Sequence, residues 1–474
     1  MNRSALSVSL AAALVCTLSV SAQGIAHGSA ARDSFDVSFG GRTLHVGLTT
    51  ANALHVELHA NGQATMSSFM IDPALRPVAV RDVSVHEDAA GIRLDAPLLH
   101  AIWDKHAQVL IVQDAAHRVL LRETDPAGLA DGHASFVHAA GEPLYGIGGY
   151  NATEDAAAGL LRKGAQKATA GEQGHAGAPF VWTTAGYGVL IDSVGADFTL
   201  ADERIDAHVP HGALDYYVIV GKPPELFGAI ATITGATPLF PKWAMGFTNS
   251  QWGIDEKELL GIVDTYRARH IPIDNFTLDF DWKAWGQDHY GEFRWNQAKF
   301  PQGPTGRLRQ ELQQRGMQLT GIMKPRIHVD TEEGRYATAH GFWSAASKAA
   351  PDYFSKQTVR ELDFDQAAVR SWFFNDTLKR SFVTGMHGWW NDEADDIGSD
   401  TQFTNMQRSL YEGQRAFSPL RVWSINRNFY LGAQRYAYAM WSGDIATGFP
   451  SMAGQRARML SAIDVGAMQW GMDG

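Results

Sequence analysis

The sequence has a single cysteine among its 474 residues, and this near-absence excludes several kinds of chemistry. Cys16 lies in an apolar run near the start of the chain, so everything after it is free of thiols. Catalysis by a thiolate, disulfide cross-links and a metal held by cysteine ligands are therefore excluded for the rest of the chain. The sequence also has no later charge-free apolar run of about 20 residues, the length that a membrane-spanning helix needs.

Several sequence motifs are absent as well. The chain has no P-loop, no Gly-rich dinucleotide fingerprint, no His-Glu-x-x-His and no Gly-x-Ser-x-Gly. These absences argue against nucleotide-binding, zinc-dependent and serine-hydrolase classes, and we expect neither a cofactor nor a metal. Basic residues are in deficit, 40 Lys and Arg against 51 Asp and Glu, which argues against a nucleic-acid-binding protein. The 14 Trp residues suit a protein that stacks aromatic rings on a neutral sugar, although most of them belong in a core.

The first residues have the pattern of an export signal. Arg3 supplies a positive charge, residues 6–20 are apolar, and Val20-Ser21-Ala22 is a small-residue cleavage site. We therefore expect residues 1–22 to be a signal peptide. The mature protein is then expected to be periplasmic or secreted, with no membrane insertion after the signal is removed.

The chain after this segment has two parts with different hydrophobic periods. Residues 33–240 contain short alternating runs such as 43–48, separated by Gly, Asn and Asp, and these predict an N-terminal β-sandwich domain. A Gly- and Ala-rich stretch, 154–178, interrupts the pattern, and it is either a mobile loop or an active-site lid.

In residues 241–474 apolar β-runs alternate with helical periods, which predicts a (β/α)8 barrel of the TIM type. About seven strands are present, whereas a closed barrel needs eight strands and about 250 residues, so we expect this domain to be incomplete at its C-terminal end. The expected strands are 243–247, 276–281, 319–323, 387–391, 422–426, 438–443 and 468–472. The expected helices are 256–269, 306–314, 366–382, 403–416 and 454–467.

Three of these strands end in acidic clusters that have a Trp beside them. Asp279 ends strand two, Asp392 ends strand four and Asp444 ends strand six. Catalytic residues of such barrels lie at the C-terminal ends of the strands, and two carboxylates on different strands can straddle a glycosidic bond. A single Asp at a strand end is more simply a helix cap or one half of an ion pair. Three Trp-flanked clusters on alternate strands favour a sugar site instead.

Several ordered motifs resemble one known family, glycoside hydrolase family 31. They are the segments 142–148 (EPLYGIG), 179–182 (PFVW), 186–190 (GYGVL), 214–217 (LDYY), 241–247 (PKWAMGF), 363–365 (DFD) and 388–390 (GWW). Members of this family are retaining α-glycosidases with a β-sandwich before a (β/α)8 barrel. The resemblance covers most of the chain from about residue 142 onward, and the order and spacing of the motifs carry it.

The resemblance implies roles for individual residues. Asp392 falls on the family's nucleophile, Asp444 in Trp-x-Gly-Asp on its acid/base, Asp279 on a position that binds sugar hydroxyls, and Arg427 on its substrate-binding arginine. The implied activity is that of an exo-acting, α-glucosidase-like hydrolase that works by double displacement through a covalent glycosyl-enzyme. The other residues expected to bind substrate are Trp390, Trp441, Asp395 and Lys324.

The sequence departs from the family pattern at two places near these residues. The nucleophile is followed by Glu393-Ala394-Asp395 instead of Met-Asn-Glu, and Lys324-Pro325 replaces a frequent Asp-Pro after strand three. The sugar therefore stays open: an α-galactosidase, an α-xylosidase, a transglycosylase and a sugar-binding pseudoenzyme are alternatives. The expected partner is an oligosaccharide or another α-glycoside, and the sequence does not predict an oligomeric state.

The mechanism leads to two expectations about geometry. A retaining enzyme needs its two carboxyl groups about 5–5.5 Å apart, so we predict that separation for Asp392 and Asp444. The nucleophile must be ionised while the acid is protonated, so the two environments should differ. We expect Asp392 beside Arg427, and Asp444 in more apolar surroundings beneath Trp441.

Overall fold

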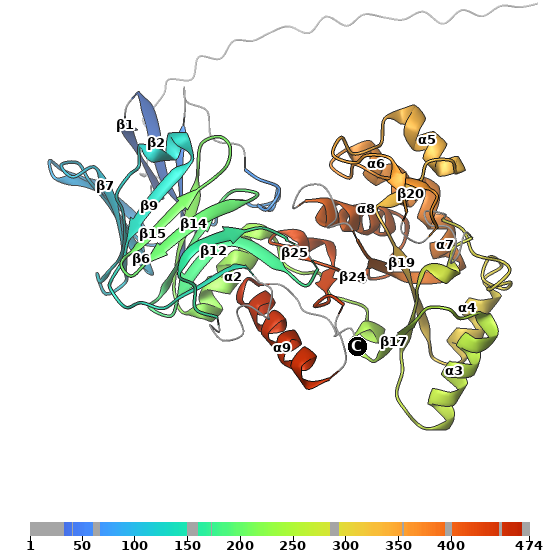
Figure 1. The fold of residues 1–474 in the computed structure, drawn as a ribbon. Coiled ribbons are helices and arrows are strands. Elements are labelled where there is room, and N and C mark those ends of the chain that lie inside the picture. Colours follow the sequence, from blue (N-terminus) through green and yellow to red (C-terminus); the bar gives the residue numbers. More distant parts are fainter. Residues whose placement is uncertain are drawn as a thin grey trace, which may run out of the picture.

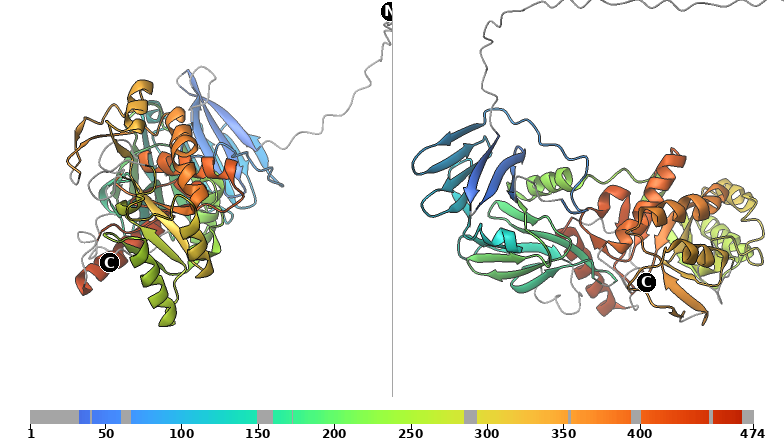
Figure 2. Two further views of the ribbon diagram at one scale, coloured as in Figure 1. Left: turned by 90° about the vertical axis from the view of Figure 1, so that its right-hand side faces the viewer. Right: turned by 90° about the horizontal axis from the view of Figure 1, so that it is seen from above.

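The computed structural model describes residues 33–39, 41–59, 67–148, 160–171, 173–284, 293–352, 355–393, 401–444 and 448–466. A strand-rich part, blue to green, lies beside a part with helices and parallel strands, yellow to red (Figures 1 and 2). The expected signal peptide 1–22 and the expected strand 468–472 lie outside the described residues. No helix among the described residues is long and apolar enough to cross a membrane.

Two antiparallel sheets face each other in the first part and form a β-sandwich. One sheet has the order β1 (Ser34–Phe39), β2 (Arg42–Thr50), β3 (Ala53–His59), β16 (Tyr216–Val220), β13 (Tyr187–Ile191), β12 (Ala176–Thr183), β10 (Leu144–Gly148). The other has the order β11 (Gly164–Ala168), β14 (Ala196–Ala201), β15 (Arg204–His208), β9 (His133–Val137), β8 (Val119–Glu123), β7 (Val109–Asp114), β6 (Leu99–Asp104), β5 (Gly91–Asp95), β4 (Ser84–Glu87).

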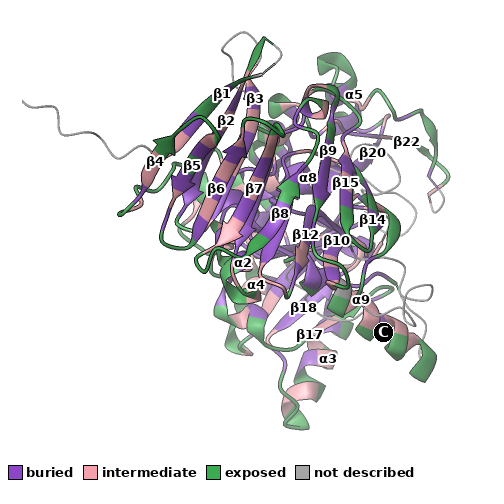
Figure 3. Ribbon diagram, turned by 90° about the vertical axis from the view of Figure 1, so that its left-hand side faces the viewer, coloured by how far each residue is buried: buried purple, intermediate pink, exposed green. Residues whose placement is uncertain are grey.

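Alternating side chains explain why these strands pack as two layers. In β6, Leu99, Ala101 and Trp103 are buried, while the residues between them are partly exposed. Because successive side chains of a strand point to opposite faces, one face of each sheet enters a shared core. Figure 3 shows this alternation of buried and more exposed residues along the strands of the sandwich.

The second part is built on a parallel sheet whose strands follow one another in chain order. Its strands are β17 (Thr248–Gln251), β18 (Asn275–Leu278), β19 (Gln318–Met323), β23 (Met386–Asn391), β24 (Ser424–Asn426) and β26 (Tyr438–Met440). Within the described residues this six-stranded sheet is open, so the closed eight-stranded barrel expected from the sequence is not confirmed. The alternation of strands and helices was predicted correctly.

Helices fill the connections between these strands. They are α3 (Glu256–Ala268), α4 (Arg307–Gln314), α5 (Glu332–His340), α6 (Ala367–Trp372), α7 (Lys379–Thr384) and α8 (Gln402–Phe417), while α9 (Phe449–Asp464) follows β26. A π-helical turn, Phe373–Leu378, joins α6 to α7, where the sequence predicts one helix. After β19 a small antiparallel sheet contains β20 (Arg326–His328), β22 (Thr358–Glu361) and β21 (Ala350–Pro351).

The start of α3 shows how local sequence fixes an element. The Asp255 carboxylate accepts the backbone N–H of Glu258 at 2.9 Å, and the Glu258 carboxylate accepts the N–H of Asp255 at 3.0 Å. This capping box satisfies backbone donors that a helix start leaves free. Leu259 and Val263 are buried on the inward side of the helix, as the apolar spacing indicates.

The first expected barrel strand was wrong. Residues 243–247 are not a strand: Lys242–Met245 is a 3-10 turn, and the first strand begins at Thr248. Pro241 has φ −64° and ψ 145° and starts the turn. The turn carries Trp243 onto Trp423, with ring centroids 5.6 Å apart, so its apolar residues pack as a turn against the start of the sheet.

The two parts of the molecule share both a core and a sheet. Helix α2 (Pro223–Thr234) packs on the sandwich, and its buried side chains belong to the same apolar cluster as those of the parallel sheet. The short strand β25 (Phe429–Tyr430) follows β24 but pairs with β12, with Ala176 opposite Phe429 and Gly177 opposite Tyr430. Residues that follow a strand of the parallel sheet are thus anchored on the sandwich (Figure 1).

Candidate active site

The acidic residues lie where the sequence predicts them, at the C-terminal ends of alternate strands. Asp279 directly follows β18 and Asp392 directly follows β23, while Asp444 lies a few residues after β26. Asp392 interacts electrostatically with Asp444 and Arg427, and its charge also acts on Asp279. One edge of the parallel sheet therefore gathers these four residues.

Asp392 is buried between two cations. Its Oδ1 lies 3.3 Å from Arg427 Nη1 and its Oδ2 lies 3.3 Å from Lys324 Nζ. Its backbone N–H donates to the carbonyl of Met323 at 2.9 Å, which ties the end of β23 to β19. Burial raises the pKa of the Asp392 carboxyl above its ordinary value, and the two cations oppose that shift. The expected neighbourhood of Asp392 and Arg427 is present.

Glu393, which departs from the family pattern, completes an ion-pair network. Its carboxylate lies 2.8 Å from Lys324 Nζ, pairs with Arg326, and is 3.9 Å from Arg427 Nη1. Burial alone would raise the pKa of Glu393, but Lys324 and Arg326 outweigh it and lower the pKa. The residue has φ 54°, a left-handed conformation that is uncommon for a non-glycine residue. Glu393 thus shares Lys324 with Asp392.

Asp279 and Lys283 form another side of the site. Asp279 begins the 3-10 turn Phe280–Trp282, and its Oδ1 accepts the N–H of Phe280 at 2.6 Å. Burial raises the pKa of Asp279 to about 6, and the charge of Asp392 acts in the same direction. Burial and the nearby Lys324 lower the pKa of Lys283 to about 7. Sequence reasoning missed Lys283, although it lies in the same strand-end motif as Asp279.

The tryptophans of strands four and six lie together, but the surroundings of Asp444 differ from the expectation. The rings of Trp390 and Trp441 meet edge to face with centroids 5.8 Å apart. Asp444 is exposed, which corrects the expectation of apolar surroundings beneath Trp441. Gly443, with φ 82°, allows the left-handed turn that precedes Asp444. The predicted separation of the Asp392 and Asp444 carboxyl groups stays a prediction.

The sequence also predicts Lys324 and Asp395 as substrate-binding residues. Lys324 is buried and forms ion pairs with the carboxylates of Asp392 and Glu393. Asp395 lies outside the described residues.

Gln173, on the sandwich, is a site residue that sequence reasoning did not single out. Its Oε1 accepts from Arg427 Nη2 at 3.2 Å and from the backbone N–H of Asp444 at 3.0 Å. The only signal was its place in the stretch 154–178, for which the sequence left a loop or a lid open. At residues 173 and 174 this stretch contacts the site.

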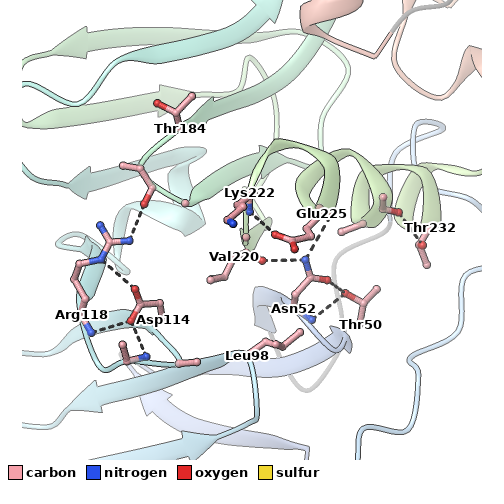
Figure 4. A pocket seen from close by; sticks show the side chains of 17 residues that line it. Thr50, Asn52, Leu98, Asp114, Arg118, Thr184, Val220, Lys222, Glu225 and Thr232 are labelled. Atoms are coloured by element: carbon pink, nitrogen blue, oxygen red, sulfur yellow. Dashed lines mark hydrogen bonds and ion pairs between the residues drawn. The ribbon is translucent and has the colours of Figure 1, made fainter.

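A separate pocket of about 750 Å³ lies on the sandwich beside α2 (Figure 4). Several polar side chains of the pocket are engaged within its own wall: Arg118 Nε donates to Asp114 at 3.0 Å, and Asn52 Nδ2 donates to the backbone carbonyl of Val220 at 2.9 Å. It has no Trp among its lining residues. The chemistry therefore places the candidate active site at the strand ends and not in this pocket.

The fold and the site define a class: parallel β/α proteins with a sandwich in front and carboxylates gathered at the C-terminal edge of the sheet. Residues 237–474 match the family model "Glycosyl hydrolases family 31 TIM-barrel domain". The chain belongs to glycosyl hydrolases family 31, so the family predicted from the sequence is confirmed.

Two curated relatives illustrate the match. A 1,6-alpha-glucosyltransferase of Sporosarcina globispora is 38% identical over 405 residues, 77% of this chain and 31% of that protein. An alpha-xylosidase of Saccharolobus solfataricus is 25% identical over 364 residues, 70% of this chain and 48% of that protein. The chain thus covers less than half of the length of each of these relatives.

Solved structures support the fold. A GH31 alpha-xylosidase from a soil metagenome, complexed with xylose, has a TM-score of 0.77 at 20% identity, over 94% of this chain and 72% of that one. A dextranase of Flavobacterium johnsoniae, complexed with glucose, has a TM-score of 0.76 at 20% identity, over 90% of this chain and 57% of that one. At these identities the likeness concerns the fold alone.

Proposed function

We propose that this chain carries the catalytic site of a retaining, exo-acting α-glycoside hydrolase, with Asp392 as nucleophile and Asp444 as acid/base. The observation that carries the proposal is the setting of Asp392, buried between Lys324 and Arg427 and coupled electrostatically to Asp444. A nucleophilic carboxylate has to be ionised in a site from which water is excluded, and two cations favour the ionised form.

The two acids then divide the reaction. In the first step an Asp392 oxygen bonds the anomeric carbon while Asp444 gives its proton to the departing oxygen, so the glycosidic bond breaks and a covalent glycosyl-enzyme forms. In the second step Asp444 takes a proton from water, the water oxygen bonds the anomeric carbon, and Asp392 leaves as a carboxylate. The exposure of Asp444 suits this role, because the leaving group and the incoming water both reach the site from solvent.

The surrounding residues position the sugar. A carboxyl with a pKa of about 6, such as Asp279, can accept or donate a hydrogen bond to a hydroxyl near neutral pH. Trp390 is partly exposed and offers aromatic surface for a sugar ring, while Trp441, only 3% exposed, packs edge to face against it, and the Arg427 guanidinium can donate to a hydroxyl. Asp395 remains a predicted hydroxyl ligand. Lys324 acts chiefly on Asp392 and Glu393.

An α-glucoside is the substrate class that we propose first. Names among the relatives include alpha-glucosidase 2 of Bacillus thermoamyloliquefaciens, alpha-xylosidases and a dextranase, so an α-xyloside is the nearest alternative. Transfer to a sugar hydroxyl in place of water is a second candidate. The 38% identity to a 1,6-alpha-glucosyltransferase favours it. Export to the periplasm or the medium, from the pattern of residues 1–22, is part of the proposal.

The anomeric form of the first sugar released tests the mechanism. The protein is mixed with a panel of nitrophenyl α-glycosides (glucoside, xyloside and galactoside), and proton NMR follows the best substrate from the first turnover. We expect the α-anomer to appear first and then to mutarotate. A first-formed β-anomer would show inversion and remove the covalent role of Asp392. Product analysis at high sugar concentration separates transfer from hydrolysis.

A further inference from the structure

We propose that Gln173 is a positioning residue that the sandwich contributes to the active site, where it holds both Arg427 and the backbone at Asp444. The inference deepens the proposed function and rests on it. Gln173 does not touch the reacting atoms in this scheme. It acts through the two residues that do, the arginine beside the nucleophile and the acid/base.

One amide oxygen joins the ends of two strands. Gln173 Oε1 accepts from Arg427 Nη2 at 3.2 Å and from the N–H of Asp444 at 3.0 Å. Arg427 follows β24 and Asp444 lies after β26, so the glutamine links neighbouring strand ends from outside the sheet. With Nη2 on Gln173, the other terminal nitrogen, Nη1, faces Asp392 at 3.3 Å. The glutamine thereby fixes the direction of the guanidinium.

Close backbone contacts keep the glutamine in place. The Gly174 N–H donates to the carbonyl of Arg427 at 2.7 Å, and a Cβ on Gly174 would lie only 2.2 Å from the carbonyl oxygen of Ser442. A Cβ on Gly443 would lie 3.2 Å from Gln173. Both glycines have positive φ, 78° and 82°, so neither position suits another residue. These two glycines let the sandwich segment lie directly against the turn before Asp444.

The segment is also attached on its other side. Asn428 Nδ2 donates to the carbonyl of Gly171 at 2.8 Å, and the Phe429 N–H donates to the carbonyl of His175 at 3.0 Å. Strand β25 continues this contact as a ladder with β12. Hydrogen bonds on both sides of residue 173 therefore hold its backbone, and its side chain has little freedom to leave the site.

The chemistry of the amide explains why a glutamine suits this position. Its oxygen accepts two hydrogen bonds without bringing a charge. A glutamate here would form an ion pair with Arg427 and draw the guanidinium from Asp392. A methionine of similar length would fill the space but accept neither bond well. Loss of the oxygen therefore loosens the acid/base more than it changes packing.

The test uses a series of aryl α-glycosides whose leaving groups differ in acidity. We expect Gln173→Met to lower kcat/KM by about 10- to 100-fold for poor leaving groups and by less than about threefold for dinitrophenol, because only poor leaving groups need the proton of Asp444. A steeper dependence of kcat/KM on the leaving-group pKa indicates a misplaced acid. A general structural defect would instead lower kcat/KM by the same factor for all substrates. Gln173→Glu should lower kcat for every substrate, because it draws Arg427 away.

The matched control is Gln166→Met on β11, in the same segment of the chain. The Gln166 amide donates to the carbonyl of Lys163 and contacts none of the proposed site residues in the described hydrogen bonds. We expect this variant to behave as the wild type. Thermal melting of each variant shows that it is folded, and Gln173→Ala provides a second substitution if the methionine variant is unstable.

The outcomes separate the two levels of the proposal. The role of Gln173 is overturned if kcat/KM depends on leaving-group pKa in Gln173→Met and Gln173→Ala as it does in the wild type, while the dependence is steeper in Asp444→Ala. That result leaves the proposed function intact. Full turnover in Asp392→Asn and Asp444→Ala overturns the proposed function itself. A steeper slope in the Gln173 variants, together with loss of turnover in Asp392→Asn, supports both.

Discussion

Two buried carboxyl groups, one in each part of the molecule, have opposite surroundings. Glu123, in the sandwich, is 2% exposed and accepts a hydrogen bond from the Tyr216 hydroxyl at 2.8 Å. The part of the chain that the structure describes places no ion-pair partner against it, and burial raises its pKa to about 8. Asp392, at the edge of the parallel sheet, is 7% exposed but lies against Lys324 and Arg427.

The difference shows that nearby cations, and not burial alone, set the protonation of a buried carboxyl in each part of the molecule. Burial penalises the charged form of both carboxyls, and nearby cations decide whether that form persists. In the sandwich, burial without a nearby cation favours the neutral form of Glu123. In the candidate active site, cations lie close to the acid although their own burial is unfavourable. Burial lowers the pKa of Lys283 to about 7, which illustrates this cost.

Removal of the charge on Asp392 should have the largest effect. We expect Asp392→Asn to lower turnover of the best α-glycoside by on the order of 10⁴-fold or more, because the amide cannot form the glycosyl-enzyme. Glu123→Gln is the matched control, an equivalent change of a buried acid, and should leave turnover unchanged. Initial rates with a nitrophenyl glycoside measure both. Equal losses in the two variants would contradict the distinction between the regions.

Lys324→Met should give the next largest effect. The cation favours the ionised form of Asp392, so its removal raises the pKa of that carboxyl further. The acid limb of the pH profile of kcat/KM should then move to higher pH, with a greater loss at pH 5 than at pH 7. Lys105→Met, at an exposed pair with Glu87, is the control. An unmoved acid limb would show that Lys324 does not govern the ionisation.

Glu123→Gln should change the pH dependence of stability. Because the folded pKa is raised from 4.5 to about 8, the protonated acid stabilises the fold at low pH, and this contribution is lost as pH rises toward 8. The variant does not titrate there, so it should gain on the order of 2 kcal/mol or more relative to the wild type between pH 5 and pH 8. Denaturant unfolding at each pH measures the difference. Parallel profiles would contradict a buried neutral acid.

Exposed ion pairs should give the smallest effects in both regions. Arg93 lies 2.8 Å from Asp95 in the sandwich, and Arg315 lies 2.7 Å from Asp264 beside the parallel sheet. We expect Arg93→Met and Arg315→Met to change the free energy of unfolding by less than about 0.5 kcal/mol and to leave turnover unchanged, because solvent screens such pairs. If either variant lost several kcal/mol in the free energy of unfolding, the exposure of an ion pair would not predict its contribution to stability in this protein.

Local pattern predicted the elements and the strand ends well. The period of the apolar residues placed β19, β23 and α3 within one residue and β18 within three. The rule that catalytic residues follow strands singled out Asp392, and the family resemblance singled out Arg427, which lies beside it. The pattern failed at residues 243–247, where an apolar run packs as a turn, since periodicity does not distinguish the two.

Contacts between distant segments were beyond the sequence. Gln173 and Asp444 are 271 positions apart, and no period or motif connects them. The same holds for the sharing of Lys324 between Asp392 and Glu393, which depends on how β19 and β23 pair. A single sequence indicates which side chains a strand end offers. Which cation each acid receives is decided by packing.

The pairing of β25 with β12 has a consequence for biosynthesis. Ala176 leaves the ribosome about 250 residues before its partner Phe429, which at roughly 5–20 residues per second is a delay of some tens of seconds. During that time the start of β12 offers unpaired backbone groups to any other strand. We expect a nascent chain that ends before Phe429 to aggregate more readily than one that extends past Tyr430, and chaperones to act in this interval.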